Sequence, residues 1–163
     1  NFGLAEQLIV GGTPVGRWLQ PSASSGPAHT DQGSVMIVLA TDAPLTTRQL
    51  RRLAVRATAG LARTGSHLAH GSGDFVIAFT TAYRLPHHLD GERGSLVDVA
   101  PMLLDEPGAM GQLLPAVVEG VEEAVLNSLC AAETMVGRDG NTRLALPLDR
   151  VAALIHHFIT NEQ

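Results

Sequence analysis

The chain has 163 residues, and 45% of them are hydrophobic, so it can bury the core of one domain without disulfides or metal ions. Its formal net charge of -5 argues against a nucleic-acid partner, because proteins that bind polyanions usually carry a basic excess. All 11 basic residues are arginine, which excludes lysine Schiff-base and lysine general-base chemistry from this chain.

Two further features concern location and redox state. No apolar run reaches the roughly 18 residues that span a bilayer, and Asn1 opens the chain without an initiator methionine or a signal-peptide pattern. We therefore expect a fragment or processed chain with no membrane partner and a cytoplasmic location. Cys130 is the single cysteine and lies in an apolar, alanine-rich stretch, which predicts a packed, inert thiol and no internal disulfide.

The first part of the chain predicts a hairpin, a linker and a strand. Residues 5–10 favour a short strand that turns back over residues 11–16, where glycines can supply positive φ angles. Residues 20–32 are rich in Pro, Ser, Gly and Ala, which is typical of an exposed linker. At Ser34 an almost unbroken apolar run with β-branched residues begins, and it predicts a strand covered on both faces.

The middle of the chain predicts a helix, a second strand and a long connection. Thr46 or Thr47 caps a helix that ends before Gly65, with its leucines and alanines on one face and its arginines on a solvated face. Residues 75–79 predict another apolar strand. Residues 83–108 predict a long connection around a possible short strand, and such loops are often functional or oligomeric.

Two helices separated by a turn are expected at the C-terminal side. Residues 109–136 show a helical pattern that we expect to be interrupted near Pro115. Residues 137–141 predict a turn, and Asp149 is expected to cap a last helix that runs through Phe158. Strands and helices in this order predict α/β layers.

The junction between Gly33 and Ser34 is the feature of the sequence that is most suited to catalysis. Taken alone, Gly-Ser is a common dipeptide that marks the end of a loop. Here a linker precedes it and a rigid strand follows, so the Ser34 hydroxyl could attack the preceding carbonyl and release a new α-amine after an N-to-O acyl shift. That amine has a reference pKa of about 7.7 to 8.0, so one residue could supply both nucleophile and base.

Several ordered blocks make this interpretation more specific. They are GSVMIVLATDAPL, GLARTGS, GSGDFVIAF and AETMVGRDG, at residues 33–45, 60–66, 71–79 and 132–140. Together with the opening Asn-Phe-Gly, these blocks resemble the P1 peptidase family, which includes L-aminopeptidase/D-esterases, D-aminopeptidases and β-aminopeptidases. The resemblance covers nearly all of the chain after the linker.

The resemblance implies a fold and a division of the chain. The family has a four-layer αββα sandwich of the self-processing N-terminal-nucleophile type, built from an α-polypeptide and a β-polypeptide. Residues 1–33 would be the tail of the α-polypeptide, with an exposed linker at about 20–33, and residues 34–163 would be the β-polypeptide. The missing N-terminal part of the α-polypeptide would supply the rest of the sandwich and would shape the substrate pocket.

The resemblance also implies site residues. Ser34 would be the nucleophile, and Ser72 matches the family's second serine, which hydrogen-bonds the nucleophile and relays its proton. Asp74 falls where some members have a glutamate that orients this serine or holds the substrate amine, although a cap of a turn is an equal alternative. Asn1 matches the asparagine whose amide helps form the oxyanion hole.

Other candidate sites have weaker support. The histidines at 67 and 70, 87 and 88, and 156 and 157 could suggest a metal, but adjacent histidines diverge and no Cys or Glu completes a ligand set. Gly71-Ser72-Gly73 precedes a strand and lacks a following lysine, so it does not predict a phosphate loop. We expect no metal and no organic cofactor.

The sequence therefore predicts a self-cleaving serine aminopeptidase, amidase or esterase that hydrolyses bonds next to a free amino group through an acyl-enzyme. Its expected partners are the remainder of the α-polypeptide and a small peptide or aminoacyl substrate, in a homo-oligomer of αβ units. One alternative is a self-processing acyltransferase resembling the ornithine acetyltransferases, which normally use threonine. Another is a catalytically silent, oligomeric relative in which Gly33-Ser34 stays intact.

Overall fold

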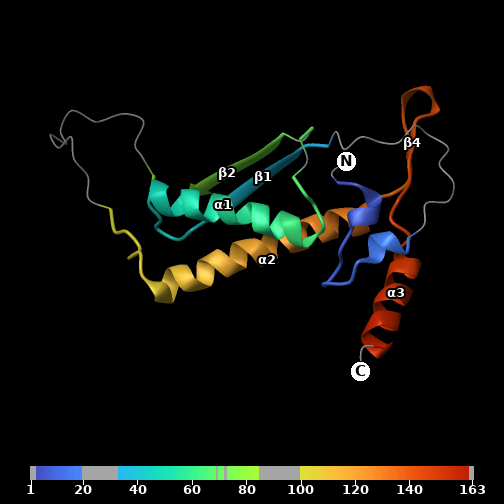
Figure 1. Cartoon of the computed structure of the whole chain (residues 1–163). Coiled ribbons are helices and arrows are strands. Elements are labelled where there is room, and N and C mark those ends of the chain that lie inside the picture. Colours follow the sequence, from blue (N-terminus) through green and yellow to red (C-terminus); the bar gives the residue numbers. More distant parts are fainter. Residues whose placement is uncertain (1–2, 20–32, 69, 72, 85–99, 162–163) are drawn as a thin grey trace.

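The computed structural model describes residues 3–19, 33–68, 70–71, 73–84 and 100–161. The predicted linker and most of the predicted long connection lie outside these residues. Within them, a pair of parallel strands lies against two long helices, and a small hairpin and a last helix follow at the C-terminal side (Figure 1). No helix among the described residues is long and apolar enough to cross a membrane.

Strands β1 (Val35–Thr41) and β2 (Asp74–Thr80) form the sheet. They pair in parallel, with Val35 opposite Asp74 and Thr41 opposite Thr80. Both predicted strands are thus confirmed. Because a parallel pair needs a crossover connection, the helix between them completes a strand-helix-strand unit.

The prediction that the first strand is covered on both faces is wrong for the described part of the chain. Alternate residues of both strands face the helices, and the others are exposed. The exposed set has between 43% and 62% of its surface open and comprises Met36, Val38, Phe75, Ile77 and Phe79. No described element lies over that face.

Helix α1 (Thr47–Arg63) connects the two strands, as predicted. The Thr46 hydroxyl accepts a hydrogen bond from the Gln49 N–H, and the Gln49 side chain bonds back to the Thr46 N–H, which makes a capping box. The helix ends before Gly65, whose φ of +97° is a conformation that favours glycine.

Helix α2 (Pro107–Ala131) packs along α1 and differs from its prediction in two respects. It runs through Pro115 without a break and ends five residues before the expected position, because residues 135–136 form a strand. Pro115 removes the hydrogen bond to the carbonyl of Gly111. Both residues are exposed, so water can satisfy that carbonyl.

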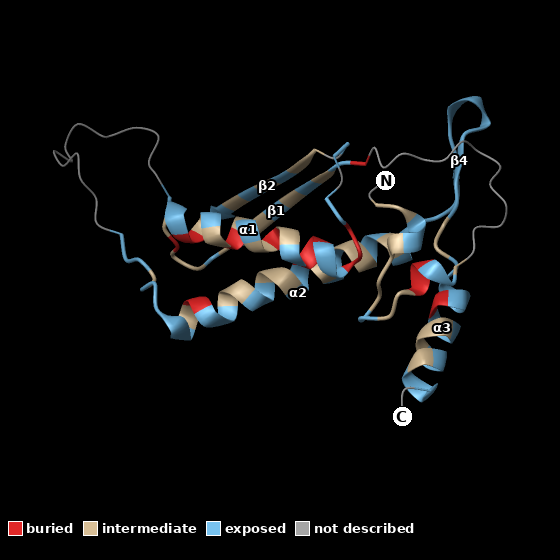
Figure 2. Cartoon of the chain, in the orientation of Figure 1, coloured by how far each residue is buried: buried red, intermediate tan, exposed pale blue. Residues whose placement is uncertain are grey.

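The core lies where α1, α2 and β1 meet, and the buried residues gather along α1 (Figure 2). The buried apolar side chains of this core are Leu45, Leu53, Ala57, Leu61, Met110 and Val121. The two helices approach closely at Gly60, where an added Cβ would lie 2.5 Å from the Val118 carbonyl oxygen. Their crossing therefore depends on a residue without a side chain at position 60.

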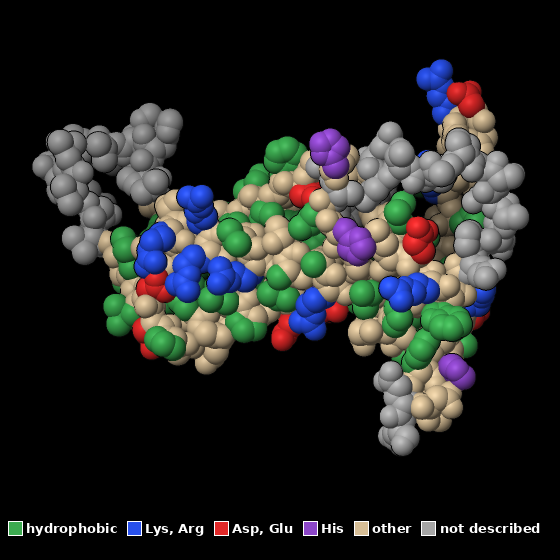
Figure 3. Space-filling model, in the orientation of Figure 1, with side chains coloured by type: hydrophobic (Ala, Val, Ile, Leu, Met, Phe, Trp, Pro, Cys, Tyr) green, Lys and Arg blue, Asp and Glu red, His purple; other side chains and the backbone are tan. Residues whose placement is uncertain are grey.

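A polar clasp fastens the start of α1 to the segment before α2. The Gln49 side chain is only 1% exposed and donates to the Leu103 carbonyl at 2.9 Å. Arg48 and Arg52 both form ion pairs with Asp105, so the arginine face of α1 carries ion pairs while remaining largely exposed (Figure 3). Partial desolvation raises the pKa of Asp105, but the hydrogen bonds and charges of Arg52 and Arg48 outweigh it and lower that pKa.

This lowered pKa has a consequence for stability in acid. Because the folded-state pKa of Asp105 lies below its ordinary value of 3.8, the clasp stabilises the fold above that pH and loses its contribution as the pH falls through the folded pKa. We expect Asp105→Asn to lower Tm at neutral pH and to flatten the fall of Tm below about pH 4. Thermal unfolding of both forms across pH measures this, and parallel curves would contradict it.

The N-terminal segment does not form the predicted strand over residues 5–10. It forms the short 3-10 helices η1 (Ala5–Gln7) and η2 (Val15–Arg17), with a tight turn at Gly11 and Gly12 between them. A single antiparallel bridge joins Val10 to Thr13, so only the turn of the expected hairpin is present. This segment bonds to the loop after α1, since the Ile9 N–H donates to the Thr64 carbonyl at 3.0 Å.

The C-terminal elements extend from the end of α2. Strands β3 (Met135–Val136) and β4 (Thr142–Arg143) form a two-residue hairpin around the 3-10 turn η3 (Arg138–Gly140) at the predicted turn. Helix α3 (Leu148–Asn161) follows. It starts one residue before Asp149, so Asp149 lies in its first turn and is not its cap. Phe158 of α3 stacks at a tilt on Trp18, with ring centroids 5.9 Å apart.

Cys130 is exposed near the end of α2, so the prediction of a packed thiol is wrong. The helical periodicity of the sequence does not decide whether Cys130 lies on the buried or the exposed face of α2. The alanines around Cys130 are exposed as well.

Candidate active site

The described part of the site lies where β1 and β2 both begin. Gly33 is buried while Ser34 is exposed, so the chain emerges from the core at the Ser34 hydroxyl. The Gly73 N–H donates a hydrogen bond to Ser34 Oγ at 3.1 Å. The backbone at Gly73 therefore helps to position the serine oxygen.

The register of the sheet explains this contact. Val35 lies opposite Asp74 in the parallel pair, so the residues just before them, Ser34 and Gly73, meet at the same edge. A Cβ added at Gly73 would lie 3.4 Å from the Phe75 ring and 3.5 Å from Ser34 Oγ, which are ordinary contact distances. The two groups are 39 residues apart in the sequence, and the pairing of β1 with β2 brings them together.

Of the other predicted site residues, Asp74 lies in the described part of the chain. Asp74 is the half-buried first residue of β2, directly after Gly73, and so stands at the same edge of the sheet as Ser34. Ser72 and Asn1 lie outside the described residues, and their roles stay predictions. The Gly73 N–H was not predicted as a partner of Ser34, and its only signal in the sequence is its place just before a second apolar strand.

A second set of contacts holds the N-terminal segment close to the loop that leads to β2. An added Cβ on Gly65 would lie 1.7 Å from the Gln7 carbonyl oxygen, so only glycine fits there. The Gln7 side-chain amide lies 3.2 Å from His67 Nδ1. These contacts link residues before the Gly33-Ser34 junction to the loop between α1 and β2.

The histidines do not assemble a metal site in the part of the chain that the structure describes. No group of three His, Cys, Asp or Glu side chains among those residues is close enough to hold an ion. The pair at 87 and 88 lies outside the described residues. His67 and His157 instead lie beside the amide side chains of Gln7 and Asn161.

A serine hydroxyl at the head of a parallel strand, held by a main-chain N–H in an α/β layer, defines a candidate for the hydrolase class with serine as nucleophile. The comparison with family models then identifies the group: residues 1–143 match the model of peptidase family S58. The chain belongs to this family, which confirms the resemblance to the P1 peptidases.

Known relatives agree with this assignment. The chain is 34% identical to the β-peptidyl aminopeptidase BapA of Sphingosinicella microcystinivorans over 97% of its own length and 41% of that protein. It superposes on the L-aminopeptidase D-Ala-esterase/amidase of Ochrobactrum anthropi with a TM-score of 0.82 at 35% identity, covering 97% of this chain and 41% of that one. That structure is described as a prototype of the serine aminopeptidases and a variant of the Ntn hydrolase fold.

A β-aminopeptidase from a Burkholderia species is similar to the same extent, with a TM-score of 0.79 at 34% identity and coverage of 96% of this chain and 42% of that one. The chain thus has the α/β fold of hydrolases of the aminopeptidase kind. It spans about two fifths of the length of the relatives that it matches.

Proposed function

We propose that this chain carries the nucleophile of a serine aminopeptidase that cleaves itself between Gly33 and Ser34. The observation that supports this most directly is the hydrogen bond from the Gly73 N–H to Ser34 Oγ. A fixed donor at a nucleophilic oxygen stabilises the negative charge that this oxygen carries when it loses its proton. The exposed position of Ser34, just outside buried Gly33, leaves the hydroxyl accessible.

Self-cleavage would proceed in two steps. Ser34 Oγ attacks the Gly33 carbonyl carbon, the C–N bond breaks, and the Gly33 acyl group moves to the oxygen while the nitrogen takes up the proton. Water then hydrolyses the ester, which leaves a carboxylate on Gly33, a free hydroxyl on Ser34 and a new α-amine on the same residue.

The new amine would then act as the base in turnover. It accepts the proton of the Ser34 hydroxyl as the oxygen attacks an amide or ester of the substrate, and the acyl-enzyme is resolved by water. In this scheme Ser72 relays the proton, Asn1 donates to the oxyanion, and Asp74 binds the free amino group of the substrate. The position of Asp74 at the same sheet edge as Ser34 supports the last of these roles.

The partners follow from surfaces that the chain leaves open. The exposed apolar face of β1 and β2 suits a second sheet packed about 10 Å away, as in the four-layer αββα sandwich. We assign that sheet to the remainder of the α-polypeptide, because the relatives are more than twice as long as this chain. We further propose that such αβ units form a homo-oligomer. The substrates would be small peptides or aminoacyl derivatives.

The role of Asp74 can be tested with substrates that differ only in the amine. We expect Asp74→Asn to lower kcat/KM for an aminoacyl ester with a free amine about 10-fold or more beyond its effect on the N-acetylated ester, because the charge pair between the Asp74 carboxylate and the substrate ammonium is lost. Asp74→Glu is the matched control and should keep most of the activity on the free amine. Equal losses on both esters would mean that Asp74 supports the loop and does not bind the amine.

The role of the amine as base predicts a pH profile. The reference pKa of an α-amine is about 7.7 to 8.0, and burial or a neighbouring cation lowers it because both disfavour the charged form. The amine is a base only when unprotonated, so kcat/KM should rise with pH to a plateau, with a midpoint at or below about 8. Rates on the N-acetylated ester from about pH 6 to 9 measure this without titrating the substrate, and a flat profile would exclude the amine as base.

A further inference from the structure

The loop from Thr64 to Gly73 is held at its first end by the N-terminal segment. The Ile9 N–H donates a hydrogen bond to the Thr64 carbonyl at 3.0 Å. The Gln7 side-chain amide lies 3.2 Å from His67 Nδ1. Both contacts come from a part of the chain that precedes the proposed cleavage site. A segment on one side of that site therefore holds a loop that lies on the other side.

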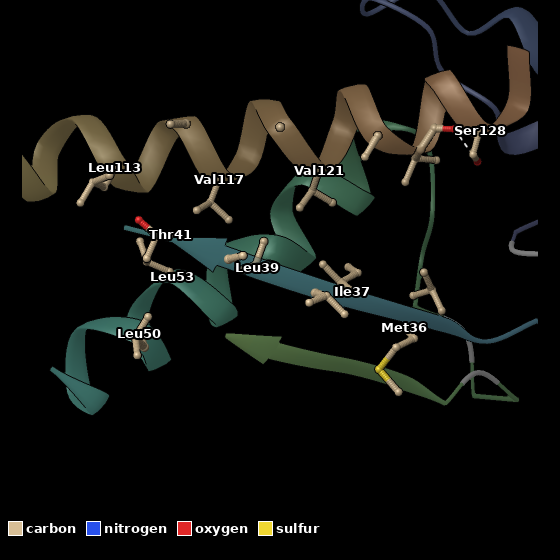
Figure 4. A pocket seen from close by; sticks show the side chains of 17 residues that line it. Met36, Ile37, Leu39, Thr41, Leu50, Leu53, Leu113, Val117, Val121 and Ser128 are labelled. Carbon is tan, nitrogen blue, oxygen red and sulfur yellow. Dashed lines mark hydrogen bonds between the residues drawn. The ribbon is translucent and has the colours of Figure 1, made fainter. Parts of the chain in front are cut away.

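The second end of this loop lies at the proposed nucleophile. In the close view of the groove between β1 and α2, the two strands begin side by side at the end marked by Met36 (Figure 4). Gly73 immediately precedes β2, and its N–H donates to Ser34 Oγ at 3.1 Å. A hydrogen bond is lost once donor and acceptor are more than about 3.5 Å apart. A small displacement of the loop is therefore enough to take the donor away from Ser34.

A second hydrogen bond sets the orientation of the Gln7 amide. The Leu4 N–H donates to Gln7 Oε1 at 3.2 Å, so the NH2 group of the amide is the part directed at His67. An amide NH2 group only donates, and an imidazole nitrogen accepts from it only while that nitrogen carries no proton. The two bonds of the Gln7 side chain, which we call the Gln7 bridge, therefore require a neutral His67 ring with its proton on Nε2.

The residue after His67 has a strained backbone. Leu68 has a φ of +50°, a left-handed conformation that is unfavourable for a residue with a bulky side chain. Its N–H donates to Oγ of the buried Ser66 at 3.2 Å. Such a conformation persists only where the surrounding contacts hold it. Leu68 is 39% exposed, so packing of its own side chain is incomplete, and the bonds at Ser66 and His67 constrain it from the N-terminal side.

We propose that Gln7 is a positioning residue for Ser34. By holding His67, it keeps the strained loop in the conformation that places the Gly73 N–H at Ser34 Oγ. Gln7 acts through the loop and touches neither the substrate nor the reacting atoms. This role rests on the proposed function in taking Ser34 as the nucleophile. It also gives the segment before the junction a part in turnover after the bond has been cleaved.

The Gln7 bridge makes this positioning sensitive to pH. Histidine is the side chain that gains its charge between about pH 8 and pH 5. A proton on His67 Nδ1 would place one donor against another, so the bridge is lost in acid. On η1 and on the loop, the other titratable side chains are Glu6 and His70. Both are exposed, and neither forms an ion pair within the part of the chain that the structure describes.

Gln7→Met in the complete protein tests the proposal, with Glu6→Met on the same turn as its matched control. Methionine has the length of glutamine but cannot donate to His67. We expect Gln7→Met to lower kcat for an aminoacyl ester about 10-fold at about pH 8 and to leave KM within about twofold, because the substrate site is untouched. Glu6→Met should leave both constants within about twofold, since Glu6 is exposed.

His67→Phe is a second variant that leaves the bond between Gln7 and Leu4 in place. Its ring has no acceptor for the Gln7 amide, and position 67 is exposed, so the protein should fold. We expect the same fall in kcat, about 10-fold, and no further fall when His67→Phe is combined with Gln7→Met, because both changes remove one contact.

Hydrogen exchange at the Gly73 amide, read by mass spectrometry, gives a readout that does not use catalysis. Relative to the intrinsic rate, the unsubstituted protein should protect this amide about 10-fold more at about pH 8 than at about pH 5.5. Gln7→Met should give the lower protection at both values. Gln7→Glu should keep the protection in acid, because a carboxylate accepts from both the Leu4 N–H and a protonated His67.

Four results would overturn the proposal. They are equal effects of Gln7→Met and Glu6→Met on kcat, an effect of Gln7→Met on KM alone, unchanged protection of Gly73 in Gln7→Met, and loss of that protection in acid by Gln7→Glu. Normal turnover by Ser34→Ala would instead contradict the proposed function. Exchange at Gly73 would then still decide whether Gln7 holds the loop.

Discussion

Ser34→Ala should leave the bond between Gly33 and Ser34 intact and reduce hydrolysis of an aminoacyl p-nitroanilide by about 10⁴-fold or more, because the hydroxyl is needed in both self-cleavage and turnover. The intact mass of the protein measures the first effect and initial rates measure the second. Ser34 is exposed, so we expect the variant to unfold at nearly the same temperature as the unsubstituted protein.

Two matched variants sharpen this result. Ser34→Thr and Ser34→Cys keep a nucleophilic atom at the same carbon and should retain some processing. An alanine variant that is still cleaved, or that turns over substrate at the normal rate, would show that Ser34 is not the nucleophile and would favour the silent relative.

Gly65→Ala should destabilise the fold by about 3 to 5 kcal/mol and detach the N-terminal segment from the loop after α1. Its Cβ would lie 1.7 Å from the Gln7 carbonyl oxygen, and its φ of +97° is strained for any residue with a side chain. Thermal unfolding measures the first effect. Faster proteolysis within residues 3–19 at a temperature well below unfolding measures the second.

Gly12→Ala is the control for Gly65→Ala. Gly12 has a φ of +82°, but a Cβ added there meets no atom within 4 Å, so it carries the backbone strain without the overlap. We expect a loss of only about 1 to 2 kcal/mol. Equal losses in the two variants would mean that the contact between Gly65 and Gln7 contributes nothing to docking of the segment.

The elements predicted well from the sequence are those with strong local signals. The β-branched run after Ser34, the second apolar strand, and the Thr46 cap with Gly65 beyond the helix end all have the expected structure. Local signals gave a wrong prediction where the surroundings of a residue determine its structure. Pro115 is tolerated because its turn of α2 is exposed.

The site was predicted only in part, for a similar reason. Ser34 could be selected because it is a side-chain nucleophile at a change of composition. The Gly73 N–H could not, since every residue except proline carries such a donor, and its proximity to Ser34 depends on the register of two strands that are distant in sequence. The roles of Ser72 and Asn1 remain predictions from the family resemblance.

The parallel pairing of β1 and β2 also has a consequence for when Ser34 acquires its donor during folding. The two bonded groups are 39 residues apart, so bringing them together costs about 3 kcal/mol of chain entropy before the contact forms. A helix such as α1 can form within about a microsecond, whereas pairing of distant strands is slow. In a newly made chain the Ser34 hydroxyl therefore lacks the Gly73 donor until β2 docks, and under the proposed function folding would delay activation of this serine.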